Sequence, residues 1–119
     1  MPSRLASPLV PAGDLVAVLT TLPTAAAAQS LADTLVRERL AACVNALPGV
    51  ASTYEWQGQL THDVEVLCLI KTQRDRLPAL VTRLHELHTY EVPEVVVLGA
   101  EAASQDYWQW LRAATTGAL

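Results

Sequence analysis

The residues with the clearest chemical potential gather in the run from His88 to Glu94. It holds one imidazole, His88, and two carboxylates, Glu91 and Glu94, within seven residues. Both groups are common ligands of divalent metal ions such as copper and zinc. The spacing matches no strong metal motif, so two interpretations stand. One is a divalent-metal site, and the other is a set of polar residues where a helix ends and a loop begins.

Two side chains outside this run could also bind a ligand. Cys43 would add a soft thiolate, which favours copper or zinc. The alternative is a strand cysteine that packs as a small hydrophobe. Lys71 follows the apolar part of its strand. It could bind an anion or form an ion pair with Glu91 or Glu94.

The sequence gives little support to catalysis. Asp63 and Glu65 stand two residues apart on a predicted strand, so both point to one face. A carboxylate pair can do acid–base work there, but solvation is the simpler interpretation. No serine has the context of a nucleophile elbow. The five glycines are scattered and form no phosphate-binding loop. We therefore expect a protein that is not an enzyme.

A long β-hairpin from Ala42 to Thr72 is the element that must position these residues. Its arms alternate in the period of two that marks half-buried strands. Gln57-Gly58-Gln59 supplies the turn, and Pro48-Gly49 predicts a bulge or bend. An arm this long spans about 50 Å, whereas a domain of this size is only about 35 Å across. The hairpin must bend or protrude, and its free edges predict an oligomer joined through the arms.

Buried strands are predicted on both sides of the hairpin, over residues 14–21 and 94–100. Amphipathic helices are predicted after the caps Thr24 and Asp75. Ser104 caps a last helix, whose packed face would carry Tyr107, Trp110, Leu111 and Ala114, with Trp108 pointing elsewhere.

This order of elements predicts an α+β fold, a ferredoxin-like βαββαβ sandwich with a long central hairpin and an extra C-terminal helix. Residues 1–13 are expected to be a flexible tail, and residues 14–119 a single domain. Cys68 should lie opposite Leu47 or Pro48, too far from Cys43 for a disulfide, so both thiols should be free.

Composition narrows the partners and the compartment. The net charge of −4 and the isoelectric point near 5.2 argue against nucleic acid, which needs a basic surface. No apolar run approaches the ~20 residues of a membrane span. No secretory signal is recognisable, so a cytoplasmic location is expected. Only 17% of residues are charged, against about 25% in a typical soluble domain, which suits a chain with subunit contacts.

Several short motifs resemble the CutA family of divalent-cation tolerance proteins, and they extend over most of the chain. They are Leu40-Ala41-Ala42-Cys43-Val44-Asn45, Pro48-Gly49, Ser52-x-Tyr54-x-Trp56-x-Gly58, Glu65, Lys71-Thr72, Tyr90-Glu91-x-Pro93-Glu94 and Tyr107-x-x-Trp110-Leu111. The resemblance implies a ferredoxin-like homotrimer in which hairpin arms pair with the sheet of the next chain. It also implies a cytoplasmic role in tolerance to copper and other divalent cations, with no established enzymatic reaction.

The resemblance leaves two functions open. In the first, a metal-responsive trimer binds copper or zinc through His88, Glu91 and Glu94, helped by Cys43. Some family members carry cysteines where this chain has Thr20 and Arg83, so a strong thiolate copper site is less expected here. In the second, a PII-like signalling or scaffolding trimer binds a small anionic ligand or a protein partner. Lys71, Tyr90 and Trp110 would then line its inter-subunit clefts.

Overall fold

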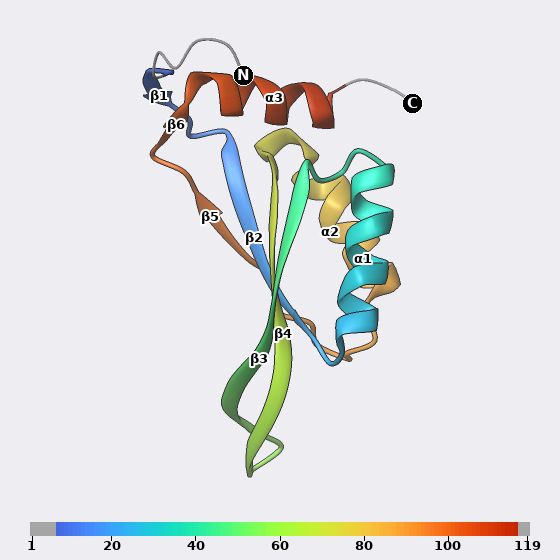
Figure 1. Cartoon of the computed structure of the whole chain (residues 1–119). Coiled ribbons are helices and arrows are strands. Elements are labelled where there is room, and N and C mark those ends of the chain that lie inside the picture. The colour runs from blue at the N-terminus through green and yellow to red at the C-terminus, as the bar shows by residue number, and fades with distance from the viewer. Residues whose placement is uncertain (1–6, 117–119) are drawn as a thin grey trace.

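A four-stranded antiparallel sheet with two helices on one face forms the body of the protein (Figure 1). The computed structural model describes residues 7–116. Its elements are β1 (Leu9–Pro11), β2 (Leu15–Leu22), α1 (Ala25–Arg37), β3 (Cys43–Trp56), β4 (Gln59–Gln73), η1 (Arg74–Arg76), α2 (Leu77–Leu87), β5 (Val96–Gly99), β6 (Ala102–Ser104) and α3 (Gln105–Thr115). The strand order β3-β4-β2-β5 confirms the predicted ferredoxin-like topology. None of the helices in residues 7–116 is long and apolar enough to cross a membrane.

Helix α1 begins at the predicted cap. The Thr24 hydroxyl oxygen accepts a hydrogen bond from the Ala27 N–H at 3.1 Å, which satisfies one of the free donors of the first turn. Its buried face carries Ala28, Leu31 and Leu35. This face packs on the central strands, where it forms the main core with side chains of β2, β4 and α2.

Helix α2 begins later than predicted. Asp75 lies in the 3₁₀ turn η1, and α2 starts at Leu77 with Pro78 in its first turn. The prediction that Asp75 caps this helix is therefore wrong, because the 3₁₀ turn already coils the chain before the α-helix starts. The predicted apolar stripe is confirmed by Leu80 and Leu84, which are fully buried.

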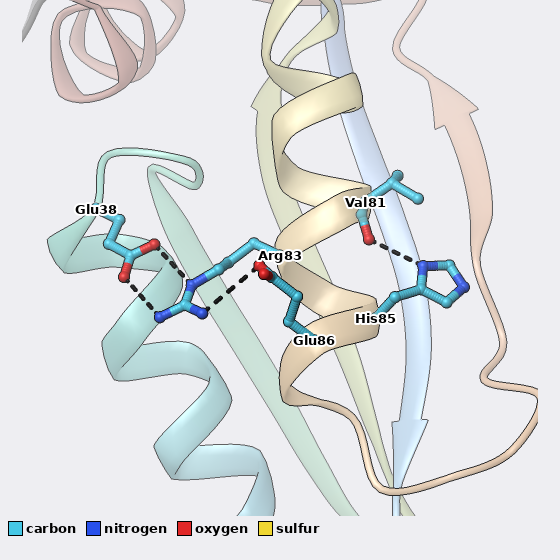
Figure 2. Close-up of polar contacts among 5 residues, drawn as sticks. All are labelled: Glu38, Val81, Arg83, His85 and Glu86. Atoms are coloured by element: carbon cyan, nitrogen blue, oxygen red, sulfur yellow. Dashed lines mark hydrogen bonds and ion pairs between the residues drawn. The ribbon is translucent and has the colours of Figure 1, made fainter.

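A bidentate ion pair ties the two helices together (Figure 2). Arg83 of α2 donates to both carboxylate oxygens of Glu38, just past the end of α1, at 2.9 and 3.0 Å. It also lies 3.6 Å from Glu86. The hydrogen bonds to Glu38 raise the pKa of the Arg83 guanidinium. This bidentate geometry adds a directional contact between the two helices, which also pack together in the main core.

The central hairpin protrudes from the body (Figure 1). Gln57 and Gly58 form a two-residue turn with φ angles of 51° and 80°, the left-handed conformation that type I′ turns require. The predicted bulge is confirmed by a register shift between Leu47 and Val50. The chain measures 54 × 29 × 25 Å, with a radius of gyration of 16.0 Å, above the ~13 Å of a globular domain of this size.

The bulge also shifts the predicted pairing of the cysteines. Cys68 lies opposite Ala46 rather than Leu47 or Pro48, because the extra residue is in β3 only. Cys43 lies opposite Lys71. Both cysteines are free thiols, as predicted. Burial raises the pKa of the Cys68 thiol.

The packed face of the last helix is shifted from the predicted one: Leu111 and Ala114 pack as predicted, but Trp108 takes the place of Tyr107 and Trp110. Trp108 is 6% exposed and Leu111 is fully buried, whereas Trp110 is 50% exposed. Trp108 and Leu111 form a second small core with Ala12, Leu15 and other residues at the end of the sheet. The prediction was wrong for Trp108 and Trp110 because Ala12, which packs in this core, was expected to belong to a flexible tail.

Part of the predicted tail belongs to the fold. Residues 9–11 form β1, which pairs with β6, and Ala12 is buried. Residues before Asp14 are thus part of the fold, and residues 1–6 of the predicted tail lie outside the described residues. Strand β5 is shorter than predicted and exposed rather than buried, because it is an edge strand that pairs only with β2.

The sheet face away from the helices is apolar and open in the single chain. Cross-strand partners share a face, and the pairs Leu47–Leu67, Leu69–Leu19 and Leu19–Val96 run across it. Leu47 and Val96 are exposed, and the other three are half-buried. Within residues 7–116, the apolar side chains of Leu47 and Val96 on this face therefore remain exposed.

Candidate functional site

A groove of about 790 Å³ lies between the protruding half of the hairpin and the segment that follows α2. Its lining comes from β2, β3, β4 and residues 89–94: Thr21, Ser52, Thr53, Tyr54, Trp56, Asp63, Glu65, Thr89, Tyr90, Glu91, Val92, Pro93 and Glu94. The segment 89–94 has no regular secondary structure. The sequence prediction thus identified one wall of the groove, but not the hairpin wall.

The groove is strongly acidic. Four carboxylates line it, Asp63 and Glu65 on the hairpin wall and Glu91 and Glu94 on the loop wall. No lysine, arginine or histidine is among its lining residues. Coulomb attraction therefore favours a cation in this groove and opposes an anion.

Two tyrosine hydroxyls hold the carboxylates of the hairpin wall. Tyr90 Oη donates to Glu65 Oε2 at 2.8 Å, and Tyr54 Oη donates to Asp63 Oδ2. Burial, followed by the bond to Glu65, raises the pKa of Tyr90. The bond to Asp63 raises the pKa of Tyr54. Both hydroxyls therefore remain protonated donors at neutral pH.

Asp63 and Glu65 share one strand face, as predicted, but they are not both solvated. Glu65 is only 7% exposed. The signal that could have revealed their role was the alternation itself. It places Tyr54 and Trp56 on the same face, since Ser52 pairs with Asp63 across the hairpin.

His88 supports the groove from behind rather than lining it. Its Nδ1 accepts a hydrogen bond from the Tyr90 backbone N–H at 3.0 Å. Nε2 therefore carries the proton and donates to the Thr21 carbonyl oxygen at 2.8 Å. With both ring nitrogens bonded and the ring 4.8 Å from that of Tyr90, His88 positions Tyr90, which in turn holds Glu65.

A second polar cluster lies where β3 and β4 approach α3. Cys43 Sγ is 3.6 Å from the Tyr107 hydroxyl, with which it shares a hydrogen bond. The Lys71 ammonium lies 6.0 Å from the centre of the Tyr107 ring. The centres of the Tyr107 and Trp110 rings are 5.6 Å apart. Burial and the bond to Cys43 raise the pKa of Tyr107 to about 12.

The structure therefore divides the predicted sites within one chain. Tyr90 lines the groove, but Lys71 and Trp110, its predicted companions for a small ligand, belong to the other cluster. Lys71 makes no ion pair with Glu91 or Glu94 in residues 7–116. Six residues of extended strand, about 20 Å, separate Glu65 from Lys71.

The predicted metal ligands are divided in the same way. Glu91 and Glu94 line the groove, His88 lies behind it, and Cys43 belongs to the second cluster. Within the described part of the chain, no three His, Cys, Asp or Glu side chains converge closely enough to hold a metal ion. One chain alone therefore presents an acidic groove but no preformed chelating centre.

The comparisons with known proteins agree with one another. The model of a family described as CutA1 divalent ion tolerance protein matches residues 16–114. A divalent-cation tolerance protein CutA from Thermus thermophilus is 46% identical over 95 residues, which cover 80% of this chain and 92% of that protein. Protein CutA from Homo sapiens is 43% identical over 103 residues, covering 87% of this chain and 58% of the human protein.

The fold comparison extends this similarity to three dimensions. The structure of CutA from Synechococcus elongatus superposes with a TM-score of 0.89 at 39% identity, over 92% of this chain and 97% of that one. The Thermus thermophilus structure gives a TM-score of 0.83 at 44% identity, over 86% of this chain and 99% of that one. Each superposition covers most of this chain, so its fold is the one seen in solved CutA structures.

Proposed function

This chain belongs to the CutA1 divalent ion tolerance family, and we propose that it is a cytoplasmic homotrimer that binds divalent cations, copper among them, without catalysing a reaction. The observation that carries this proposal is the groove with four carboxylates and no basic side chain among its lining residues. Carboxylate oxygens bind most divalent ions, and copper binds more tightly than the other first-row divalent metals at a given site.

The proposed ligands are those whose placement permits it. Glu91 and Glu94 face the groove from a segment without regular secondary structure, so they can approach a cation with little loss of hydrogen bonding. His88 would join them only by giving up its bond to Tyr90 or to Thr21. Cys43 is too far away within its own chain, so it would contribute only from a neighbouring subunit.

The open side of the fold supports the proposed trimer. An uncovered apolar sheet face marks an interaction surface, and the exposed strands β3 and β5 leave two sheet edges able to pair with another chain. The protruding hairpin reaches beyond the body of its own chain (Figure 1). In the proposed assembly, each hairpin pairs with the sheet of the next chain, which covers both features.

The assembly is tested by native mass spectrometry. The expected mass is three times the 12.8 kDa of one chain. A variant with Leu47→Asp and Leu67→Asp places two charges on the open face and should shift the protein towards monomer. A wild-type protein that stays monomeric at ~10 µM would refute the trimer.

The cation site is tested by calorimetric titration of metal-stripped protein with Cu²⁺ and Zn²⁺. The double variant Glu91→Gln and Glu94→Gln should lose at least about tenfold in affinity, since it keeps the shape of the groove and removes two charges. His62→Ala is the matched control, because His62 is an exposed imidazole near the hairpin tip and is not among the lining residues of the groove. Binding that is unaffected by the double variant, or is lost in His62→Ala, would show that the groove is not the site.

A small anionic ligand, the alternative function, fits the second cluster better than the groove. Lys71 makes no ion pair in residues 7–116, and it lies beside the exposed Trp110 and the ring of Tyr107. An anion that binds there should be lost in Lys71→Ala and should be insensitive to the Glu91 and Glu94 substitutions. Titration with inorganic phosphate and with a dicarboxylic acid would decide between the two sites.

A further inference from the structure

We propose that residues 7–12 form a latch for the last helix. In its closed state the latch holds the start of α3 beside the second cluster. Its release frees Tyr107 from Cys43 and exposes the Cys43 thiol, while the main core stays folded. The inference does not depend on the proposed function, because residues 7–12 line neither the acidic groove nor the open sheet face.

The latch lies beside the start of α3 and provides partners for its first turn (Figure 1). The Gln105 N–H donates to the Pro8 carbonyl oxygen at 2.9 Å. The Asp106 N–H donates to the Ser7 hydroxyl oxygen, also at 2.9 Å. The predicted cap, Ser104, stands at the N-cap position, but its side chain makes no cap hydrogen bond. The free N–H groups of the helix start therefore depend on a segment far away in the sequence, and they lose these partners when the latch opens.

The latch also covers one side of α3 with apolar side chains. Ala12 is buried and Val10 is half-buried, and both belong to the second small core that buries Trp108. Side chains alternate along β1, so its neighbouring residue Leu9 points away from this core and is 76% exposed. Among the described residues, the second small core shares no member with the main core. The two cores can therefore open separately.

The far end of α3 is held by other elements. Arg39 donates to two carbonyl oxygens of its last turn, each at 3.3 Å. The side-chain amide of Gln73 donates to the Thr115 hydroxyl oxygen at 2.9 Å. Neither contact involves the latch. Release of the latch therefore frees the first turns of α3, which carry Tyr107, and leaves the last turn in place.

Few contacts keep the latch closed. Strand β1 has three residues and pairs only with the three residues of β6, and a lone two-stranded sheet is marginally stable. Segments with so few contacts open locally at a free energy well below that of global unfolding. Cys43 Sγ lies 3.6 Å from the Tyr107 hydroxyl, whereas Cys68 is fully buried in the main core. The two thiols therefore report separately on local and on global opening.

The test compares the rates at which DTNB modifies Cys43 and Cys68 in the full-length protein. Val10→Asp places a charge in the second small core, so Cys43 should react at least about tenfold faster, with no change at Cys68. Ser7→Ala removes only the cap, so Cys43 should react about fivefold faster, the factor that corresponds to the ~1 kcal/mol of a lost N-cap. Leu9→Asp is the matched control, because it makes the same change on the exposed side of β1, and both rates should stay unchanged.

Hydrogen exchange locates the opening. In Val10→Asp, the amides of residues 105–110 should exchange at least about tenfold faster, and those of α1 should not change. The inference is overturned if both cysteines accelerate equally, since the second small core would then unfold together with the main core. It is also overturned if Leu9→Asp acts like Val10→Asp.

Native mass spectrometry of the same variants separates the latch from assembly. A changed mass for Val10→Asp would overturn the inference, because the segment would then serve a subunit contact. A normal response of the latch variants in a protein that binds no divalent cation would remove the proposed function and leave this inference standing.

Discussion

Two buried threonines should respond in opposite ways to the same substitution. Thr20 on β2 and Thr72 on β4 are both fully buried. The Thr72 hydroxyl donates to the Leu40 carbonyl oxygen at 2.7 Å. The Thr20 hydroxyl has no hydrogen-bond partner among the described residues. We therefore expect Thr20→Val to stabilise the protein and Thr72→Val to destabilise it.

The magnitudes follow from the state of each hydroxyl. A buried polar group without a partner costs about 1–3 kcal/mol, so replacing the Thr20 hydroxyl with a methyl group should raise the free energy of unfolding by ~1 kcal/mol. Thr72→Val removes a hydrogen bond and leaves a buried carbonyl without its donor, which should cost about 1–2 kcal/mol. Valine has the shape of threonine, so neither change should create a cavity.

The assay is urea denaturation followed by circular dichroism, with thermal denaturation as a second measure. All variants are compared at one protein concentration, because the stability of an oligomer depends on concentration. One kcal/mol corresponds to about 4 °C in melting temperature for a chain of this length. The slope of the urea transition should not change, since the surface exposed on unfolding is the same.

The reasoning fails if both valine variants shift stability in the same direction by similar amounts. That result would mean that the Thr20 hydroxyl is satisfied in solution, or that the bond from Thr72 contributes nothing. The same measurement on Thr20→Ser separates the contribution of the hydroxyl to stability from that of the methyl group. Serine keeps the unpartnered hydroxyl and loses packing, so it should be less stable than wild type.

Three further predictions concern the second cluster and the C-terminal helix. Arg39 has a φ of 59° and donates to two carbonyl oxygens at the end of α3, so Arg39→Ala should lower the melting temperature more than Arg39→Gly, which loses the bonds but relieves the backbone. The pKa of Tyr107 is raised from 10 to about 12, so its contribution to stability is full below pH 10 and is lost as pH rises through about 12. Urea midpoints between pH 9 and pH 12 should fall accordingly, and less steeply in Tyr107→Phe. The thiol reagent DTNB should modify Cys43 well before Cys68, which is fully buried with a raised pKa; equal rates in the native protein would contradict this.

Local sequence signals were enough to predict the order of elements and the hairpin. Alternation in the arms, the turn predicted at Gln57-Gly58-Gln59 and the Pro48-Gly49 bulge are local signals; the first and last were confirmed, and the turn lies at Gln57-Gly58, with Gln59 already in β4. The Thr24 cap and the apolar stripe of α2 are local in the same sense. Such features depend on residues close together in the chain, so neighbouring side chains are enough to specify them.

Which residues share a site became clear only from the folded chain. The run from His88 to Glu94 was predicted as one ligand cluster, but the fold turns His88 towards the Thr21 carbonyl and brings Asp63 and Glu65 to the loop instead. Likewise, a second core at the end of the sheet, which includes Ala12 and Leu15, buries Trp108 of α3 and leaves Trp110 exposed. Contacts between residues far apart in the chain depend on register, on the bulge and on burial. A local pattern of residues does not specify this register or this burial, because both depend on distant parts of the chain.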